Sequence, residues 1–313
     1  FIKKWLLNIN ISGDFIEILF NIIKDISTEI SIKYAALVRL LQIVKSSWLV
    51  SLSPDIKQIF LSNYIVLLYG EGPNFNNLFQ FFSNLIIDAV LTLNEWPDIY
   101  SHIIFNPVNQ IPALILMKSI AHYFKHAKQN EREQFYQFTP FFIHSTYQIF
   151  SDSQSYQEIS LIYNSFYYLI INDPEYFKNI DSEIIIGIIT KFCIFCQFQN
   201  DELYQQSLKS ASKTILLIFN KKITPTNISP DLLISSFNIA FSLFSNDLKP
   251  NVRYQITKLI CSFFDFQIIT EYFFNEPQNI IESFILPFYI SPEIKSDLYD
   301  EIFDLFTPCN SSI

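Results

Sequence analysis

Glycine is scarce in this chain: the 313 residues include only four glycines, together with one methionine and four cysteines. Tight hairpin turns and phosphate-binding loops depend on glycine, so its scarcity argues against a strand-rich fold and against a nucleotide-binding loop. Four cysteines in a chain of this length form no disulfide framework, which suits a reducing compartment. Cationic residues are outnumbered by acidic ones: the chain has 21 Lys and Arg and 30 Asp and Glu, which gives a net charge of −9. This balance disfavours direct nucleic-acid binding and favours basic protein partners.

Apolar side chains are abundant, since 50% of the residues are hydrophobic and 17% are aromatic. They recur with helical period in stretches separated by short Asn, Asp, Ser and Pro segments. Helices are expected near 1–9, 13–26, 30–47, 54–69, 74–92, 96–104, 109–127, 131–150, 154–171, 181–198, 201–220, 229–246, 250–266, 278–290 and 295–306. Neighbouring pairs give units of roughly 40 residues, the HEAT period. The sequence therefore predicts an all-α fold, an α-α superhelix (solenoid) of tandem HEAT-like helix pairs.

The domain organisation follows from the absence of any linker or low-complexity tract in the sequence. We expect residues 1–313 to form a single continuous solenoid, and we interpret the start at Phe1 as an N-terminally truncated fragment. Membrane insertion is not expected. The apolar stretch 184–198 contains Lys191, and the stretch 161–171 is shorter than the roughly 20 residues of a spanning helix. A multi-spanning membrane protein is the minor alternative.

Proline-containing start signals mark several of the expected helices. A Ser or Asp can cap the helix, and Pro is tolerated in the first turn because its missing N–H has no partner there. These signals are Ser53-Pro54-Asp55, Asp173-Pro174-Glu175, Ser229-Pro230-Asp231 and Ser291-Pro292-Glu293.

The helix expected at 30–47 has the clearest amphipathic pattern. One buried stripe is predicted from the spacing of Ile32, Ala35, Ala36, Leu40, Ile43, Val44 and Trp48. The small Ala35 and Ala36 would let a neighbouring helix approach closely. Polar positions around the stripe are supplied by Lys33, Arg39, Gln42 and Lys45.

Residues 32–48, which read IKYAALVRLLQIVKSSW, carry a resemblance to a known family. This segment resembles the N-terminal signature of the importin-β (karyopherin-β) family: a basic residue, two small residues, an apolar run and a closing Trp. Residues 95–99, EWPDI, resemble the family's Trp-Pro-acidic step at the start of a short helix. The resemblance makes Ala35, Ala36, Trp48, Trp96 and Pro97 structural motif positions. It identifies residues 1–105 as importin N-terminal-like and 106–313 as further HEAT repeats.

Later segments are similar, in the same order, to the importin-seven/eight branch of that family. They are 116–125 with 130–133, 207–211 with 216–219, and 284–288 with 296–303. Two departures from the family's pattern bear on the inherited partner contacts. The family's Leu-Lys-Asn is replaced by Leu40-Leu41-Gln42, and the branch's acidic insertion is reduced to residues 200–202.

The resemblance implies a nuclear transport receptor that shuttles between nucleus and cytoplasm through the nuclear pore. It implies binding of the GTP form of the small GTPase Ran, of basic protein cargo and of Phe-Gly nucleoporins, without a cofactor or a catalytic group. It places Lys33, Gln42 and Lys45 on the Ran-facing side. The acidic residues Asp297, Asp300, Glu301 and Asp304 would face basic cargo, or would only keep that end soluble.

Two pairs of residues have the spacing of metal or redox sites. His122 and His126 lie four apart on one expected helix, but no catalytic glutamate stands between them, and Lys125 would repel a cation. Cys193 and Cys196 have redox spacing within an apolar helix, where buried thiols are the simpler interpretation. We therefore expect no metal, no cofactor and no enzyme activity. An exportin of the same family and a HEAT scaffold without Ran binding are the alternative functions.

Overall fold

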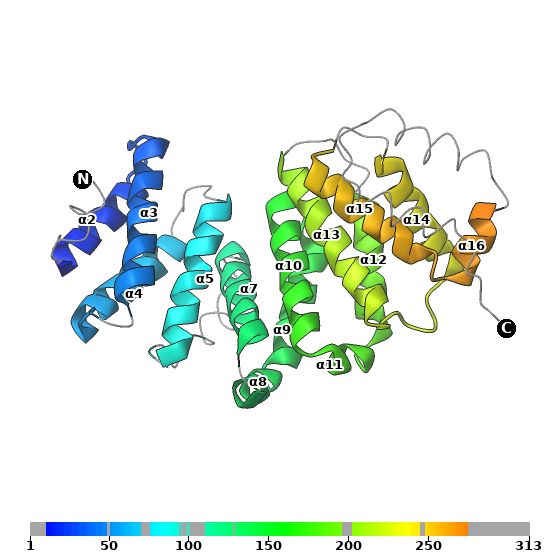
Figure 1. Ribbon diagram of the computed structural model, residues 1–313, viewed down its shortest axis with the longest axis horizontal. Coiled ribbons are helices and arrows are strands. Elements are labelled where there is room, and N and C mark those ends of the chain that lie inside the picture. Colours follow the sequence, from blue (N-terminus) through cyan, green and yellow to red (C-terminus); the bar gives the residue numbers. More distant parts are fainter. Residues whose placement is uncertain are drawn as a thin grey trace, which may run out of the picture. The chain divides into compact units, whose positions relative to one another are not determined.

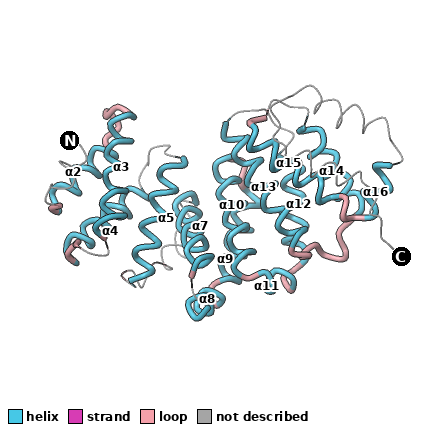
Figure 2. The backbone as a smooth tube through the Cα atoms, viewed as in Figure 1, coloured by secondary structure: helices cyan, strands magenta, loops and turns pink. Residues whose placement is uncertain are grey.

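The computed structural model describes residues 11–48, 51–69, 76–93, 95, 99, 110–127, 129–195, 202–244 and 248–274. Over these residues all the regular secondary structure is helical, and the helices pack against one another in tandem (Figure 2). The predicted all-α fold with the packing of an α-α repeat solenoid is confirmed. The chain divides into two compact units, Phe1–Phe135 and Tyr136–Ile313. That the repeats continue across both units stays a prediction.

Unit 1 arranges its helices in two layers. Its helices are α2 (Gly13–Lys24), α3 (Ile30–Ser47), α4 (Pro54–Tyr69), α5 (Asn76–Leu93) and α7 (Gln110–His126), followed by α8 (Gln129–Tyr136) at the unit boundary. Helix α3 packs against α5 and α5 against α7, which makes one layer (Figure 1). Helix α2 packs on both α3 and α4, which places α2 and α4 in the second layer. Helix α2 therefore contacts both its pair partner α3 and the equivalent helix of the next pair, α4.

An aromatic cluster fills the core of unit 1. Phe20, Phe60, Phe82, Tyr64 and Trp48 are at most 1% exposed. The ring of Phe60 lies edge-on to Phe20 at 5.1 Å and to Trp48 at 5.2 Å, and the ring of Phe82 lies 6.0 Å from it. Edge-to-face pairs at these separations add stability beyond the buried area. One cluster thus joins α2, α4 and α5 to the end of α3.

Unit 2 repeats the two-layer plan. Its helices are α9 (Thr139–Asp152), α10 (Tyr156–Asn172), α11 (Pro174–Lys178), α12 (Ser182–Phe195), α13 (Glu202–Asn220), α14 (Pro230–Phe244), α15 (Pro250–Phe263) and α16 (Gln267–Phe274). Helices α10, α13 and α15 lie side by side in one layer (Figure 1). Helices α12, α14 and α16 form the other layer, and α12–α13 and α14–α15 pack as pairs between the layers.

Small side chains bring α10 and α13 into close contact. Ala211 is fully buried in this unit, and Ser210 contacts the hydroxyl of Ser160 at 3.1 Å. The amide of Asn164 donates to Ser210 Oγ at 2.9 Å, and the hydroxyl of Thr214 donates to the carbonyl of Tyr163 at 2.8 Å. Hydroxyl groups so close to a neighbouring backbone leave no room for a larger side chain.

The helix prediction was wrong in two places. The helix expected at 131–150 is two helices, α8 and α9, because Pro140 lies in the first turn of α9. A proline there has no N–H to continue a preceding helix, and its ring clashes with the preceding turn. Helix α16 was not predicted, because the sequence before Gln267 offers no Ser-Pro or Asp-Pro start. The start signals at Ser53 and Asp173 are confirmed: their side chains accept from the N–H of Ile56 and of Tyr176.

The predicted buried stripe of α3 is partly wrong. Ala36, Leu40, Ile43, Val44 and Trp48 are buried as expected. Ile32 is 50% exposed and Ala35 is exposed as well, so Ala35 cannot provide the expected close helix contact. Their places in the stripe are taken by three further buried residues of the same helix, Leu37, Leu41 and Ser47.

Among the helices of the described residues, none combines the length and the hydropathy that crossing a bilayer requires.

We expect Ala211→Leu to lower the free energy of unfolding by about 1–3 kcal/mol, because the added atoms would push α13 away from its neighbours. Chemical denaturation followed by far-UV circular dichroism measures the change. Lys209→Leu, on the half-exposed side of the same helix, is the control and should shift stability by only about 0.5 kcal/mol. Equal effects at both positions would contradict the packing of α13.

Candidate functional site

Trp48 directly follows the last residue of α3 and begins the turn into α4. The turn closes where the N–H groups of Ser51 and Leu52 both donate to the carbonyl of Ser47, at 2.9 and 3.1 Å. Helix α4 then begins at Pro54, with Ser53 Oγ accepting from the N–H of Ile56 at 3.4 Å. These contacts satisfy terminal backbone groups that would otherwise lack partners, and they fix where the indole ring points.

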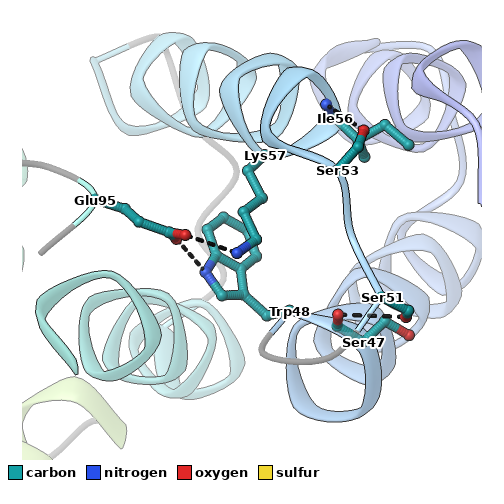
Figure 3. Close-up of polar contacts among 7 residues, drawn as sticks. All are labelled: Ser47, Trp48, Ser51, Ser53, Ile56, Lys57 and Glu95. Atoms are coloured by element: carbon teal, nitrogen blue, oxygen red, sulfur yellow. Dashed lines mark hydrogen bonds and ion pairs between the residues drawn. The ribbon is translucent and has the colours of Figure 1, made fainter. Parts of the chain in front are cut away.

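The indole nitrogen of Trp48 takes part in a partly buried polar contact with two other segments. Trp48 Nε1 donates to Glu95 Oε2 at 2.9 Å, and Lys57 Nζ pairs with Glu95 Oε1 at 2.6 Å. The ammonium of Lys57 also lies 5.8 Å from the centroid of the Trp48 ring. Figure 3 shows the Glu95 carboxylate, two residues after the end of α5, pointing toward both nitrogens, which come from the end of α3 and from α4. We call these three residues the Trp48 node.

The Trp48 node has the features of a structural anchor. The side chains of Lys57 and Glu95 are 15% and 27% exposed, so water screens their attraction only in part. Both oxygens of Glu95 have a donor, which is the condition for burying a carboxylate at low cost. The node therefore fixes the end of α3 relative to α4 and α5.

The predicted Ran-facing residues do not lie on one side of α3. Lys33 and Gln42 are nine residues apart, which is two and a half helical turns, so they point in opposite directions. Lys33 faces the turn after α2: hydrogen bonds from Ser27 and Thr28, together with the nearby charge of Lys33, lower the pKa of Asp25. Gln42 and Lys45 are exposed on the other side. Only Gln42 and Lys45 can contribute to one binding surface.

Several predicted site residues lie outside the residues that the structure describes. They are Trp96, Pro97, Asp297, Asp300, Glu301 and Asp304. Ile99, the last residue of the Trp-Pro segment, is described and is fully buried.

A second polar region, which sequence reasoning missed, lies between α5 and α7. Lys118 is only 8% exposed, and its ammonium donates to Gln80. One residue further on, Ser119 donates to Asn84 at 2.8 Å. Burial lowers the pKa of Lys118 to about 8 and raises the pKa of Asp88 on α5 to about 6. The sequence signal was a lone lysine inside the apolar run 111–121, where a lysine has little access to water.

His122 and His126 stack edge-on, with ring centroids 5.6 Å apart. Burial, followed by the charges of His126, Lys118 and Lys125, lowers the pKa of His122 to about 4. Within the described part of the chain, no three His, Cys, Asp or Glu side chains gather in a way that could hold a metal ion.

The thiol of Cys193 is half-buried and contacts Ser236 Oγ at 3.1 Å, joining α12 to α14. Burial raises the pKa of this thiol, which makes it a poorer nucleophile. Cys196, its predicted partner in the redox spacing, lies outside the described residues.

No family model matches this chain, and no curated protein matches its sequence significantly. The resemblance to the importin-β family therefore depends on the residues quoted above.

We expect Trp48→Ala to lower the free energy of unfolding by about 3–5 kcal/mol, because it empties a buried site and leaves Glu95 without one of its donors. Trp48→Phe retains the ring contact with Phe60 and should cost less, about 1–2 kcal/mol. Thermal denaturation measures both. Tyr34→Ala on the exposed side of α3 is the control, and an unchanged melting temperature for Trp48→Ala would contradict the anchoring role.

We expect Lys118→Met to raise the free energy of unfolding at pH 7 by about 1–3 kcal/mol, since the methionine needs no desolvated charge. The folded-state pKa of Lys118, about 8, lies below the ordinary lysine value of 10.5, so between these values the unfolded chain binds a proton that the folded chain does not. The free energy of unfolding of the wild type therefore rises as pH increases from about 8 to 10.5, and it falls again as pH decreases from 10.5 to about 8.

Denaturation curves of both proteins across this pH range test the assignment. The advantage of Lys118→Met should shrink toward pH 10.5. A constant difference between the two proteins at every pH would mean that Lys118 is not held charged in the core.

Proposed function

We propose that this chain is an importin-like nuclear transport receptor, which binds Ran-GTP, protein cargo and Phe-Gly nucleoporins. The observation that carries the proposal is the hydrogen bond between Trp48 and Glu95. Trp48 closes the first segment that resembles the family, and Glu95 opens the second. A plain scaffold has no need to keep both segments, whereas in this unit they form one anchor. The resemblance of segment 32–48 and that of segment 95–99 thus support each other, because the two segments are in contact.

The outward side of α3 has the composition of a protein-binding surface. Tyr34 and Val38 are 39% and 41% exposed, and they share a side of the helix with Gln42 at four-residue spacing. Lys45 extends the same surface by one turn. Phe81, 54% exposed, lies on α5, the next helix of this layer. Exposed apolar and aromatic side chains bordered by polar ones are typical of protein interfaces. We call Tyr34, Val38, Gln42 and Lys45 the α3 outer face.

Binding at such a face would need no chemical step by the protein. A tandem helical array presents extended surfaces, and two partners on it can compete or assist each other through a coupling free energy. The direction of transport would depend on the sign of this coupling between Ran and cargo. An exportin of the same family would differ only in the sign of the coupling free energy between Ran and cargo. The alternative from another functional class is a HEAT scaffold that does not bind Ran.

We expect immobilised Ran locked in its GTP form to retain the chain, and the GDP form not to retain it. Gln42→Ala combined with Lys45→Glu should weaken retention by about tenfold, because both residues belong to the α3 outer face. Lys33→Glu, which points to the opposite side of the same helix, should change it by about twofold or less. Biolayer interferometry with the full chain gives the dissociation constants.

Equal retention by both nucleotide forms, or by neither, would favour the scaffold. A larger effect of Lys33→Glu than of the double variant would mean that Ran contacts the Lys33 side of α3, which contradicts binding at the α3 outer face. Once a cargo is in hand, its release on addition of Ran-GTP would indicate import, and tighter binding would indicate export.

A further inference from the structure

The layer of unit 2 formed by α10, α13 and α15 carries a charge opposite to that of the whole chain. These three helices contain two acidic residues, Glu158 and Glu202, both in the first turn of their helix. Glu158 accepts from the hydroxyl of Ser153 at 2.7 Å, and Glu202 pairs with Lys249 at 2.7 Å. Beyond these first turns α10 has no charged side chain, and the charged side chains of α13 and α15 are all cationic, although the chain has a net charge of −9.

Lysines lie over tyrosine rings on the outward side of this layer. Lys209 and Lys213 are one turn apart on α13, and Lys213 Nζ lies 3.9 Å from the ring centroid of Tyr167 on α10. On α15, Lys258 Nζ lies 4.6 Å from the ring centroid of Tyr254, which is 38% exposed. We call these five residues the lysine–tyrosine strip.

The helix packing places all five residues on one surface. Helices α13 and α15 bury their other sides against α12 and α14. The N–H of Lys249, just before α15, donates to Gln205 on α13 at 2.8 Å, which fixes how the two helices align. Lys258 is nine residues after Lys249, and Lys213 is eight after Gln205, so the two lysines lie at the same level.

The surroundings of Lys213 favour binding of a carboxylate. Partial burial lowers its pKa, so the ammonium has already lost part of its hydration. The tyrosine ring beneath it restricts the side chain by a cation–π contact. An ammonium that is both partly desolvated and restricted forms a stronger hydrogen bond to an anion, and loses less conformational entropy in doing so, than a free surface lysine.

We propose that the lysine–tyrosine strip binds an extended, acidic segment of a partner protein. Such a segment places carboxylates over Lys209, Lys213 and Lys258 while its backbone and side chains contact the two tyrosine rings. A long nucleic acid fits less well, because its charge extends beyond the strip into the field of a chain with net charge −9. A short acidic segment stays within about a Debye length of the lysines. This site goes beyond the transport proposal and does not depend on Ran binding.

Fluorescence anisotropy with a fluorescein-labelled peptide of roughly ten glutamates, at about 0.1 M salt, tests the site on the full chain. Lys209→Gln combined with Lys213→Gln should weaken binding by about tenfold or more. Lys213→Arg, which keeps the charge and can stack on Tyr167, should retain binding to within about threefold. Lys221→Gln with Lys222→Gln removes the same charge from exposed positions just after α13 and should weaken binding by about twofold or less.

Three results would overturn the proposal: no binding by the wild-type chain, equal weakening by both lysine pairs, or tighter binding of a labelled oligothymidine than of the peptide. Far-UV circular dichroism establishes that each variant is folded. If the double variant does not fold, Lys209→Gln alone, at a half-exposed position, should weaken binding by about threefold. An unchanged affinity for that single variant would likewise contradict the strip.

Discussion

Burial of apolar helix faces between successive helices is the constraint on which the rest of this structure depends. In each unit a helix can bury its apolar side only against its pair partner and the equivalent helix of the next pair. The chain meets this demand in two ways. Aromatic rings such as Phe20, Phe60 and Phe82 fill the space between the layers of unit 1. Small residues such as Ser210 and Ala211 let helices of one layer in unit 2 lie close together.

Polar groups in these apolar surroundings specify which helix alignment is formed. Hydrophobic contact alone tolerates small shifts along a helix, whereas a buried hydrogen bond is lost when its partners move apart. The Trp48 node fixes α3 against α4 and the segment after α5, and Lys118 with Ser119 fixes α7 against α5. Asn164 and Thr214 do the same for α10 and α13. The outward sides are then left for contacts with other molecules.

Within the residues that the structure describes, the sequence was sufficient for the fold class and for most helix positions, because apolar periodicity and Ser-Pro or Asp-Pro starts are local signals. The boundary before Pro140, where α9 begins, was not predicted. Helix α16 was missed because no Ser-Pro or Asp-Pro start precedes it. Ile32 and Ala35 were placed in the core because their spacing fits a helical stripe, but the stripe runs along a slightly different side of α3. The contacts of Lys57 with Glu95 and of Lys118 with Gln80 join residues 38 apart, and no local pattern reveals such pairs.

The Trp48 node also has a consequence for how unit 1 opens. In arrays where each repeat contacts only its neighbours, one repeat can fray while the others remain folded. The node joins residues 47 apart, from the end of α3 to a residue two positions after α5, with α4 held through Lys57. Breaking the node exposes two partly buried charges at once, those of Lys57 and Glu95. We therefore expect α3, α4 and α5 to open and close together as one cooperative block. Amide hydrogens in these three helices would then exchange with solvent through a shared opening event rather than helix by helix.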